Sequence, residues 1–137
     1  MERITLDAAW KATAAMLERA GADGGEPVAL CVVDATGTVI TLARMDNVPE
    51  RIAAIVTGKA YTAARLRKST AAFRRRLVEG NFTLGDFCDD KLTSLPGGVP
   101  VFDGKTCLGA VGVSGRRLEE DEELADAFAA VIVAGLG

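Results

Sequence analysis

Two pairs of β-rich segments, each joined by a short turn, constrain the fold of this chain more than any other feature. In chain order, the segments are residues 28–34 and 38–44, then 99–102 and 106–113. Ala35-Thr36-Gly37 separates the first pair, and the turn signal Asp103-Gly104 lies within the second. Connections this short join antiparallel strands. The pattern predicts two β-hairpins and an antiparallel sheet, and it argues against a doubly wound parallel sheet.

Segments whose apolar residues recur at helical spacing surround the two hairpins. They span residues 5–20, 49–67, 70–79 and 118–136. Thr5 and Gly21 are the expected N-cap and C-cap of the first segment. Pro49 suits the first turn of the second, and Thr70 is the expected cap of the third. Residues 81–98 have no sustained period and are predicted to form a loop. This order of elements predicts an α+β domain with helices packed on the antiparallel sheet.

The length and charge of the chain limit its organisation and its partners. With 137 residues, we expect one domain over residues 1–137, because domains usually run about 100 to 200 residues. The formal charge of -3 argues against a general nucleic-acid binder. No stretch reaches the roughly 18 apolar residues that a membrane span needs, and the start does not resemble a signal peptide. We therefore expect a cytoplasmic protein that binds neither nucleic acid nor membrane.

The chain contains no histidine and three cysteines. Without histidine it lacks the commonest general base, the commonest metal ligand and every Ser-His or Cys-His nucleophile pair. Cys31, Cys88 and Cys107 have no CxxC spacing, so they predict neither a disulfide framework nor a zinc site. We expect a reducing compartment and no metal site.

Lys59 is the most informative single residue, because it falls inside the apolar stripe of the predicted helix 49–67. It comes three residues after Val56 and four before Ala63, which places the three side chains on one helix face. Two explanations stay open. The stem could lie on apolar surface while the ammonium reaches water, or the ammonium could bind an acidic ligand.

Two glycine-containing segments could supply backbone donors to an anion. The run from Gly109 to Gly115 leads from a strand into a helix start, where free N–H groups could bind an anion beside Ser114. Its spacing fits neither a dinucleotide fingerprint nor a phosphate loop, and its glycines could instead let a helix pack closely on the sheet. The turn at Gly97 and Gly98 could approach a ligand or simply reverse the chain.

Charged residues gather in two places along the chain. Six basic residues fall between positions 65 and 76, and only Phe73 interleaves with them as an aromatic residue. We expect a solvated or intersubunit face there, since a stacking platform for single strands needs more aromatic residues. Five acidic residues, 119–123, open the last helix, where the helix dipole stabilises negative charge.

Several motifs in order resemble the GlcG/HbpS family, which includes the C-terminal domain of PduO-type proteins. The resemblance covers almost the whole chain, and several motifs in the right order are more specific than any one of them. The motifs are Thr5-Leu-Asp-Ala-Ala9, Val33-Asp34 with Gly37, Arg44-Met45-Asp46, Gly58-Lys59-Ala60 with Thr62-Ala63-Ala64, Leu95-Pro-Gly-Gly-Val-Pro100, and Gly109-Ala-Val-Gly-Val-Ser-Gly115 followed by Asp121-Glu122.

The resemblance implies a profilin-like α+β fold, with a central antiparallel β-sheet of about five strands flanked by α-helices. It also implies oligomers, a link to haem or cobalamin metabolism or to small-molecule catabolism, and haem binding in several members. The chain departs from the family where Arg116-Arg117 replaces a common Gly-Gly pair. Without histidine, haem iron would have to bind Tyr61, Met45, a cysteine or Lys59, or no protein ligand at all. The missing histidine thus weakens the expectation of haem as a cofactor.

The first functional hypothesis is a homo-oligomeric protein that holds a small organic acid or a haem carboxylate at one end of the sheet. Charged side chains and backbone donors that converge on a pocket can bind such a carboxylate. The predicted ligand-binding residues are Arg44, Asp46, Lys59, Thr62, Gly97, Gly98, Ser114, Gly115, Arg116 and Asp121.

Two alternatives stay open beside ligand binding. A small catabolic enzyme could use Lys59 as a base or Schiff-base nucleophile on a carboxylated substrate. A carboxylate would then handle the second proton, and the candidates are Asp34, Asp46 and Asp121. A regulatory module could instead dock the basic residues 65–76 on an acidic surface of another protein.

Overall fold

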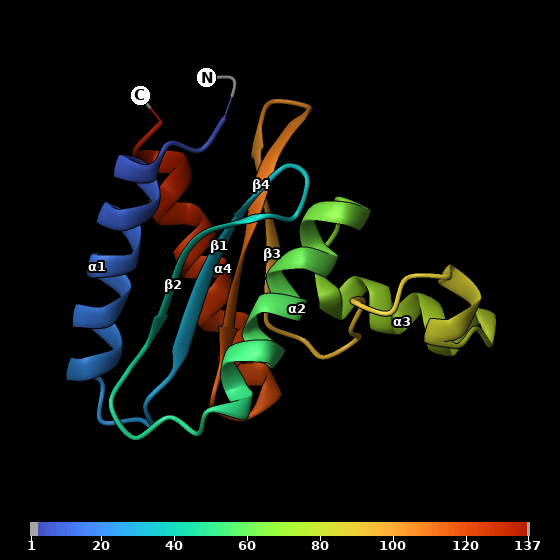
Figure 1. The fold of residues 1–137 in the computed structure, drawn as a ribbon, viewed down its shortest axis with the longest axis horizontal. Coiled ribbons are helices and arrows are strands. Elements are labelled where there is room, and N and C mark those ends of the chain that lie inside the picture. Colours follow the sequence, from blue (N-terminus) through green and yellow to red (C-terminus); the bar gives the residue numbers. More distant parts are fainter. Residues whose placement is uncertain (1–2, 137) are drawn as a thin grey trace.

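Four strands form one antiparallel sheet in the computed structural model, which describes residues 3–136. The predicted domain also included Met1, Glu2 and Gly137, which lie outside the described residues. The strands are β1 (Ala29–Asp34), β2 (Val39–Arg44), β3 (Gly98–Asp103) and β4 (Thr106–Ser114). In space they follow the order β2-β1-β4-β3 (Figure 1). Both predicted hairpins and the antiparallel sheet are confirmed, but the sheet has four strands where the resemblance implied about five.

Each hairpin turns at a glycine with a positive φ, a conformation that residues with a Cβ rarely adopt. Gly37, with φ 87°, lies between β1 and β2, and Gly104, with φ 60°, lies between β3 and β4. The central β1–β4 pairing then joins the two hairpins. In that pairing Ala29 lies opposite Ser114, and Asp34 lies opposite Gly109. These pairs define two ends of the sheet, the Ser114 end and the Asp34 end.

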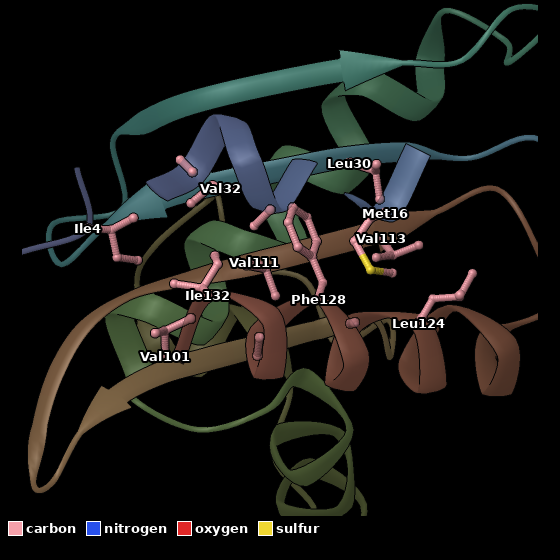
Figure 2. Close-up of a cluster of buried hydrophobic side chains, with 14 of the residues drawn as sticks. Ile4, Met16, Leu30, Val32, Val101, Val111, Val113, Leu124, Phe128 and Ile132 are labelled. Carbon is pink, nitrogen blue, oxygen red and sulfur yellow. The ribbon is translucent and has the colours of Figure 1, made fainter. Parts of the chain in front are cut away.

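Two helices cover one face of the sheet, and their apolar stripes form the larger core. These are α1 (Leu6–Ala22) and α4 (Leu118–Ala134), which lie side by side in Figure 1, with α1 at the left of the strands and α4 behind them. Figure 2 shows Met16 of α1 and Phe128 of α4 directed at strand residues such as Val111. Because this face is apolar along both helices, the packing follows from the helical spacing read in the sequence.

Helix α2 (Arg51–Leu66) covers the opposite face through small side chains. Its Ala60 and Ala63 are buried with Cys31 and Ala110 of the central strands. Gly112 permits this close approach, since a Cβ there would lie 2.6 Å from the carbonyl oxygen of Val56. At Gly112, the structure therefore agrees with the interpretation that the glycines of the 109–115 run let a helix pack closely on the sheet.

The segment between α2 and β3 projects to one side of the sheet (Figure 1). It contains α3 (Thr70–Gly80) and a short 3-10 helix, η1 (Leu84–Phe87), inside the stretch predicted to be a loop. Phe73 and Phe87 meet edge to face with ring centroids 5.0 Å apart. The projecting segment therefore has a small apolar cluster of its own, separate from the two faces of the sheet.

The helix ends differ slightly from those expected. Thr5 is the N-cap of α1 as predicted, and its Oγ1 accepts a hydrogen bond from the Ala8 N–H at 3.1 Å. Gly21 is not the C-cap, because the helix continues through it to Ala22. The N-cap of α3 is Ser69, not Thr70. Over residues 3–136, no helix is both long and apolar enough to cross a membrane.

Candidate functional site

Lys59 lies in the interior, paired with Asp121 at the Ser114 end of the sheet. The side chains of both residues are only 1% exposed. The Lys59 ammonium donates to Asp121 Oδ2 at 3.1 Å and to the Val113 carbonyl oxygen at 3.0 Å. The other carboxylate oxygen of Asp121 accepts from the Arg116 backbone N–H at 3.0 Å. This ion pair links α2 to the start of α4 through the end of strand β4.

Burial shifts both members of the pair toward their neutral forms. It lowers the pKa of Lys59, while the charge of Asp121 opposes that shift. It also raises the pKa of Asp121, against the opposing charge of Lys59. A buried pair whose hydrogen bonds are satisfied is tolerated, whereas either partner alone would be an uncompensated buried charge. As arranged here, the Lys59 ammonium is committed to Asp121 and does not face solvent.

The glycine turn before β3 is shaped by Lys59. Gly97 has φ 126°, and a Cβ there would lie 2.9 Å from the Lys59 ammonium and 2.5 Å from the Val113 oxygen. The turn is held further by Thr70, whose Oγ1 accepts from the Gly98 N–H at 2.9 Å. In this arrangement, the two glycines make room for the buried lysine and the neighbouring strand.

Arg116, which departs from the family pattern, forms hydrogen bonds at the C-terminal end of α1. Its guanidinium forms two bonds to the Asp23 carboxylate, at 2.7 and 2.8 Å, and its side chain is 5% exposed. It also donates through Nε to the Glu26 carbonyl oxygen at 2.6 Å. The hydrogen bond from Arg116 lowers the pKa of Asp23 to about 2. Next to it, Gly115 packs against the chain, since a Cβ there would lie 2.6 Å from the Pro27 oxygen.

The structure gathers most of the predicted ligand-binding residues at the Ser114 end but leaves others apart. Arg44 is at this end, because Ala29 pairs with both Arg44 and Ser114, and its Nη1 donates to the Val48 oxygen at 2.7 Å. Asp46, in the turn that follows, is exposed. Thr62 is buried along α2, where its Oγ1 bonds Gly58 and Thr93. The structure therefore brings these residues near one end without placing them in one open pocket.

Asp34 lies at the other end of the sheet from Lys59. Its Oδ1 accepts from the N–H groups of Thr36 and Thr38, at 2.8 and 3.1 Å, and so shapes the β1–β2 turn. The catalytic pairing of Lys59 with Asp34 does not form, because the two side chains belong to opposite ends of the sheet.

A hollow of about 830 Å³ lies on the solvent side of α2. Its walls come from the β1–β2 turn, the outer face of α2 and the segment before β3. The lining residues are Thr36, Gly37, Thr38, Leu42, Ala53, Ala54, Thr57, Gly58, Tyr61, Arg65, Asp90 and Lys91. We refer to it as the α2 hollow.

Tyr61 stands at the centre of the charged part of this hollow. Its hydroxyl donates to Asp89 at 2.6 Å, and that bond raises the pKa of Tyr61, so the side chain stays a phenol. The Arg65 guanidinium lies 5.8 Å from the ring centroid, and the Lys91 ammonium lies 5.5 Å from it. Gly37 leaves room for the ring, since a Cβ there would come within 2.6 Å of Tyr61 Cδ2. Two cations thus flank one fixed aromatic ring.

The α2 hollow was not found as a site from the sequence. The sequence places Arg65 in the basic cluster predicted to form a solvated or intersubunit face, and it gives no sign of a role for Lys91. Their spacing carries no signal, because Lys91 reaches Tyr61 only through the return of the chain after η1. The rest of the basic cluster lies elsewhere, with Arg74 and Arg75 exposed on the projecting α3.

The fold and the hollow define a small α+β domain with an open, ligand-sized depression beside helix α2. The chain belongs to the HbpS-like family, described as haem degrading proteins, whose model matches residues 4–130. This confirms the resemblance to the GlcG/HbpS family drawn from the motifs. Membership places the protein in a family linked to haem and other small ligands.

Known relatives extend over most of the chain. An uncharacterised 15.0 kDa protein of Citrobacter freundii, from the dhaT-dhaS intergenic region, is 34% identical over 125 residues, or 90% of this chain and 87% of the relative. The structure of Klebsiella pneumoniae ORFY has a TM-score of 0.87 at 29% identity, covering 98% of this chain and 93% of that one. A double mutant of Streptomyces reticuli HbpS gives 0.83 at 30% identity, covering 100% and 89%.

The side chains expected as haem ligands are either engaged elsewhere or lie outside the α2 hollow, and the exposed Cys88 and the half-buried Cys107 belong to the second group. Lys59 is buried against Asp121, and Tyr61 is a phenol bound to Asp89. Met45 accepts the Val28 N–H on its sulfur at 3.4 Å. Cys31 is buried, which raises its thiol pKa to about 12. Tyr61 is the one member of the expected set that lines the α2 hollow, so this chain offers no suitable axial ligand there.

Proposed function

We propose that this protein binds a small molecule bearing a carboxylate, either an organic acid or a tetrapyrrole such as haem, in the α2 hollow. The proposal rests on one observation, the placement of Arg65 and Lys91 beside Tyr61. Within residues 3–136, neither cation forms an ion pair within 4.0 Å. Both side chains are exposed at the rim of a ligand-sized hollow. Cations in this setting can exchange water for a carboxylate.

Haem enters this proposal through the family. The family description names haem, and haem carries two propionate carboxylates. A carboxylate is also the group common to the organic acids expected from the sequence. The α2 hollow lies within the range of about 300 to 1,000 Å³ that is usual for sites of drug-sized ligands. Both ligand sources therefore share the chemistry that Arg65 and Lys91 offer.

The closed state of the Lys59 group argues for this location over the one predicted from the sequence. A ligand that reached Lys59 would have to displace Asp121 from a pair that is 1% exposed. The enzyme hypothesis requires the same displacement of Asp121, because Lys59 would have to contact a substrate. Arg65 and Lys91 need no such displacement.

Assembly into a homo-oligomer in the cytoplasm remains part of the proposal. Four large apolar side chains on α1 and the edge strand β2 are exposed, namely Leu6, Trp10, Val39 and Leu42. Exposed apolar residues that gather over neighbouring elements are typical of surfaces that another subunit covers. Leu42 also lines the α2 hollow, so such a subunit would sit beside the ligand.

Native mass spectrometry of the protein taken directly from cells tests this function. We expect a retained carboxylated ligand or, after addition of haemin or a panel of small carboxylic acids, a stoichiometric complex. Absorbance in the Soret region reports haem independently. A protein that retains nothing and binds neither haemin nor any acid of the panel would contradict the proposed function.

A further inference from the structure

We propose that the projecting segment between α2 and β3 docks on an anionic lipid surface, with the apolar side chains of its outer end inserted among the lipids. The inference is independent of the α2 hollow, because it rests on other residues. Docking at a membrane surface needs no spanning helix, since apolar side chains flanked by cations bind at the level of the headgroups. The expectation of no membrane partner came from the missing spanning segment, which does not bear on surface docking.

Three apolar side chains are exposed at the outer end of the segment. Val78, near the end of α3, is 74% exposed, and Phe82 and Leu84 after it are 44% and 38% exposed. In Figure 1 this end of α3 and the adjoining η1 lie away from the sheet, at the right. We refer to residues 78–84 as the tip. Exposed apolar residues that gather in one place are typical of a surface that a partner covers.

The backbone of the tip is fixed although these side chains are exposed. Asn81 ends α3 in the left-handed region with φ 55°, and the Phe82 N–H donates to the Leu77 carbonyl oxygen at 2.8 Å. The Thr83 N–H then donates to Asp86 Oδ2 at 2.9 Å. The tip therefore presents its apolar side chains in one backbone arrangement, so docking costs it little backbone freedom.

Arginine side chains flank the tip. Arg74 and Arg75 precede Val78 by four and three residues, which brings each of them next to Val78 on the helix surface. The Arg76 guanidinium lies 5.8 Å from the centroid of the Phe82 ring. All three arginines are exposed, and within residues 3–136 none of them forms an ion pair within 4.0 Å. Their charges are therefore available to an anionic partner.

The uneven charge of the molecule favours lipid as that partner. Residues 67–85 hold five of the 16 basic residues and one of the 19 acidic residues, so the rest of the chain is net acidic. An anionic bilayer attracts the first part and repels the second, which orients the projecting segment toward the lipid. The bilayer also offers the tip an apolar interior, which the hydrated acidic surface of a protein does not.

Co-sedimentation with vesicles measures the docking. At low ionic strength, the wild type should bind vesicles of phosphatidylcholine mixed with phosphatidylglycerol at least about fivefold more tightly than vesicles of phosphatidylcholine alone. Raised salt should weaken the binding, because the arginines act through charge. A wild type that binds neither kind of vesicle, or both equally, would overturn the proposal.

A matched pair of variants tests the apolar contribution of the tip. Phe82→Ser/Leu84→Ser should weaken binding to the mixed vesicles at least about fivefold, because it removes two side chains from the apolar contact. Val131→Ser/Val133→Ser removes two exposed apolar side chains from α4 and should leave the binding unchanged. Circular dichroism checks that the variants remain folded. Equal losses in the two variants would overturn the location.

A second pair tests the charges without altering the apolar side chains. Arg74→Gln/Arg75→Gln should weaken binding to the mixed vesicles at least about fivefold, since each cation near an anionic surface contributes to the attraction. Arg19→Gln/Arg51→Gln removes the same charge from exposed positions on α1 and α2 and should have a much smaller effect. A larger loss in the second variant would overturn the orientation.

A tryptophan moved to the tip reports insertion. Trp10, on α1, is the only tryptophan of the chain. In Trp10→Phe/Phe82→Trp, the emission should shift to the blue when the mixed vesicles are added, because the indole enters the apolar region. The wild type, whose tryptophan lies on α1, should show no shift. An unchanged emission of the double variant on sedimenting vesicles would overturn insertion.

Two further outcomes would assign the tip to another partner. If Phe82→Ser/Leu84→Ser changed the subunit number in native mass spectrometry without lipid, the tip would be a contact between copies of this chain. If the wild type bound soluble poly-glutamate but no vesicles, its partner would be an acidic polypeptide. Either result would overturn docking on lipid, and neither would affect the ligand proposed for the α2 hollow.

Discussion

Lys59 and Arg65 lie on the same helix, fewer than two turns apart, but their charged groups have different environments and partners. The Lys59 side chain is 1% exposed and meets Asp121, its partner inside the protein. Arg65 is exposed and meets a tyrosine ring at the rim of a hollow. The comparison teaches that an unexpected cation in an apolar stripe is not by itself a ligand site. What decides its role is whether the fold supplies an anion of its own.

The largest effect should follow from breaking the buried pair. Lys59→Met would leave the buried Asp121 carboxylate without its cation, and removal of one member of a buried pair costs about 3 to 5 kcal/mol. Urea denaturation of the wild type and the variant measures this loss. Lys59→Met/Asp121→Leu, which removes both charges, should recover most of it. A single variant as stable as the wild type would mean that Lys59 does not stabilise the fold.

A smaller effect is expected at the turn that supports the hollow. Gly37→Ala places a Cβ at positive φ and against Tyr61, whereas Gly24→Ala also meets a positive φ but has open space around it. We expect Gly24→Ala to cost about 1 to 2 kcal/mol and Gly37→Ala to cost about 1 kcal/mol more. Only Gly37→Ala should weaken ligand binding, because it displaces the ring between the cations. Thermal unfolding and titration of both variants check this difference.

The Arg116–Asp23 pair should make stability fall at acid pH. The pKa of Asp23 in the folded protein is about 2, below the ordinary value of 3.8, so the pair stabilises the protein above about pH 4. That contribution is lost as the pH falls from 4 to 2. Asp23→Asn should lower stability at pH 7 and flatten the decline between pH 4 and 2. Urea unfolding of the wild type and of Asp23→Asn at pH 7 and pH 3 measures this difference. If both proteins lost the same stability between pH 7 and pH 3, the prediction would be wrong.

The smallest effect is expected for an ion pair in water. Lys11 and Asp7 lie one turn apart on α1, 3.0 Å from each other, with side chains about three-quarters exposed. Such pairs contribute about 0.3 to 0.5 kcal/mol. Lys11→Ala should therefore change the urea midpoint only slightly. If Lys11→Ala lost as much stability as Lys59→Met, the proposed difference between buried and exposed ion pairs would be wrong.

The sequence predicted those parts of the fold that depend on neighbouring residues. The two hairpins, the N-cap Thr5 and the apolar face of the helix that carries Lys59 follow from turns, caps and spacing. The 3-10 helix η1 was missed, since four residues are too few to show a period. The sheet has four strands where the resemblance implied about five, and only the tertiary structure reveals that number.

The candidate site was less predictable because it depends on distant parts of the chain. Spacing placed Lys59 in the interior, but whether it met Asp121 or a ligand depended on where α4 begins relative to α2. Nothing near Arg116 indicated that its guanidinium would reach Asp23 at the end of α1. The α2 hollow likewise needs the β1–β2 turn and Lys91 brought to the same helix face.

The order of the strands also has a consequence for how quickly the chain can fold. Each hairpin pairs residues close in sequence, but the central pairing joins residues 29–34 to residues 109–114. Closing so long a loop costs chain entropy before the core repays it, so non-local pairing slows folding. We therefore expect substitutions in β1 and β4 to reduce the folding rate. Changes in the projecting α3 should act mainly on the unfolding rate.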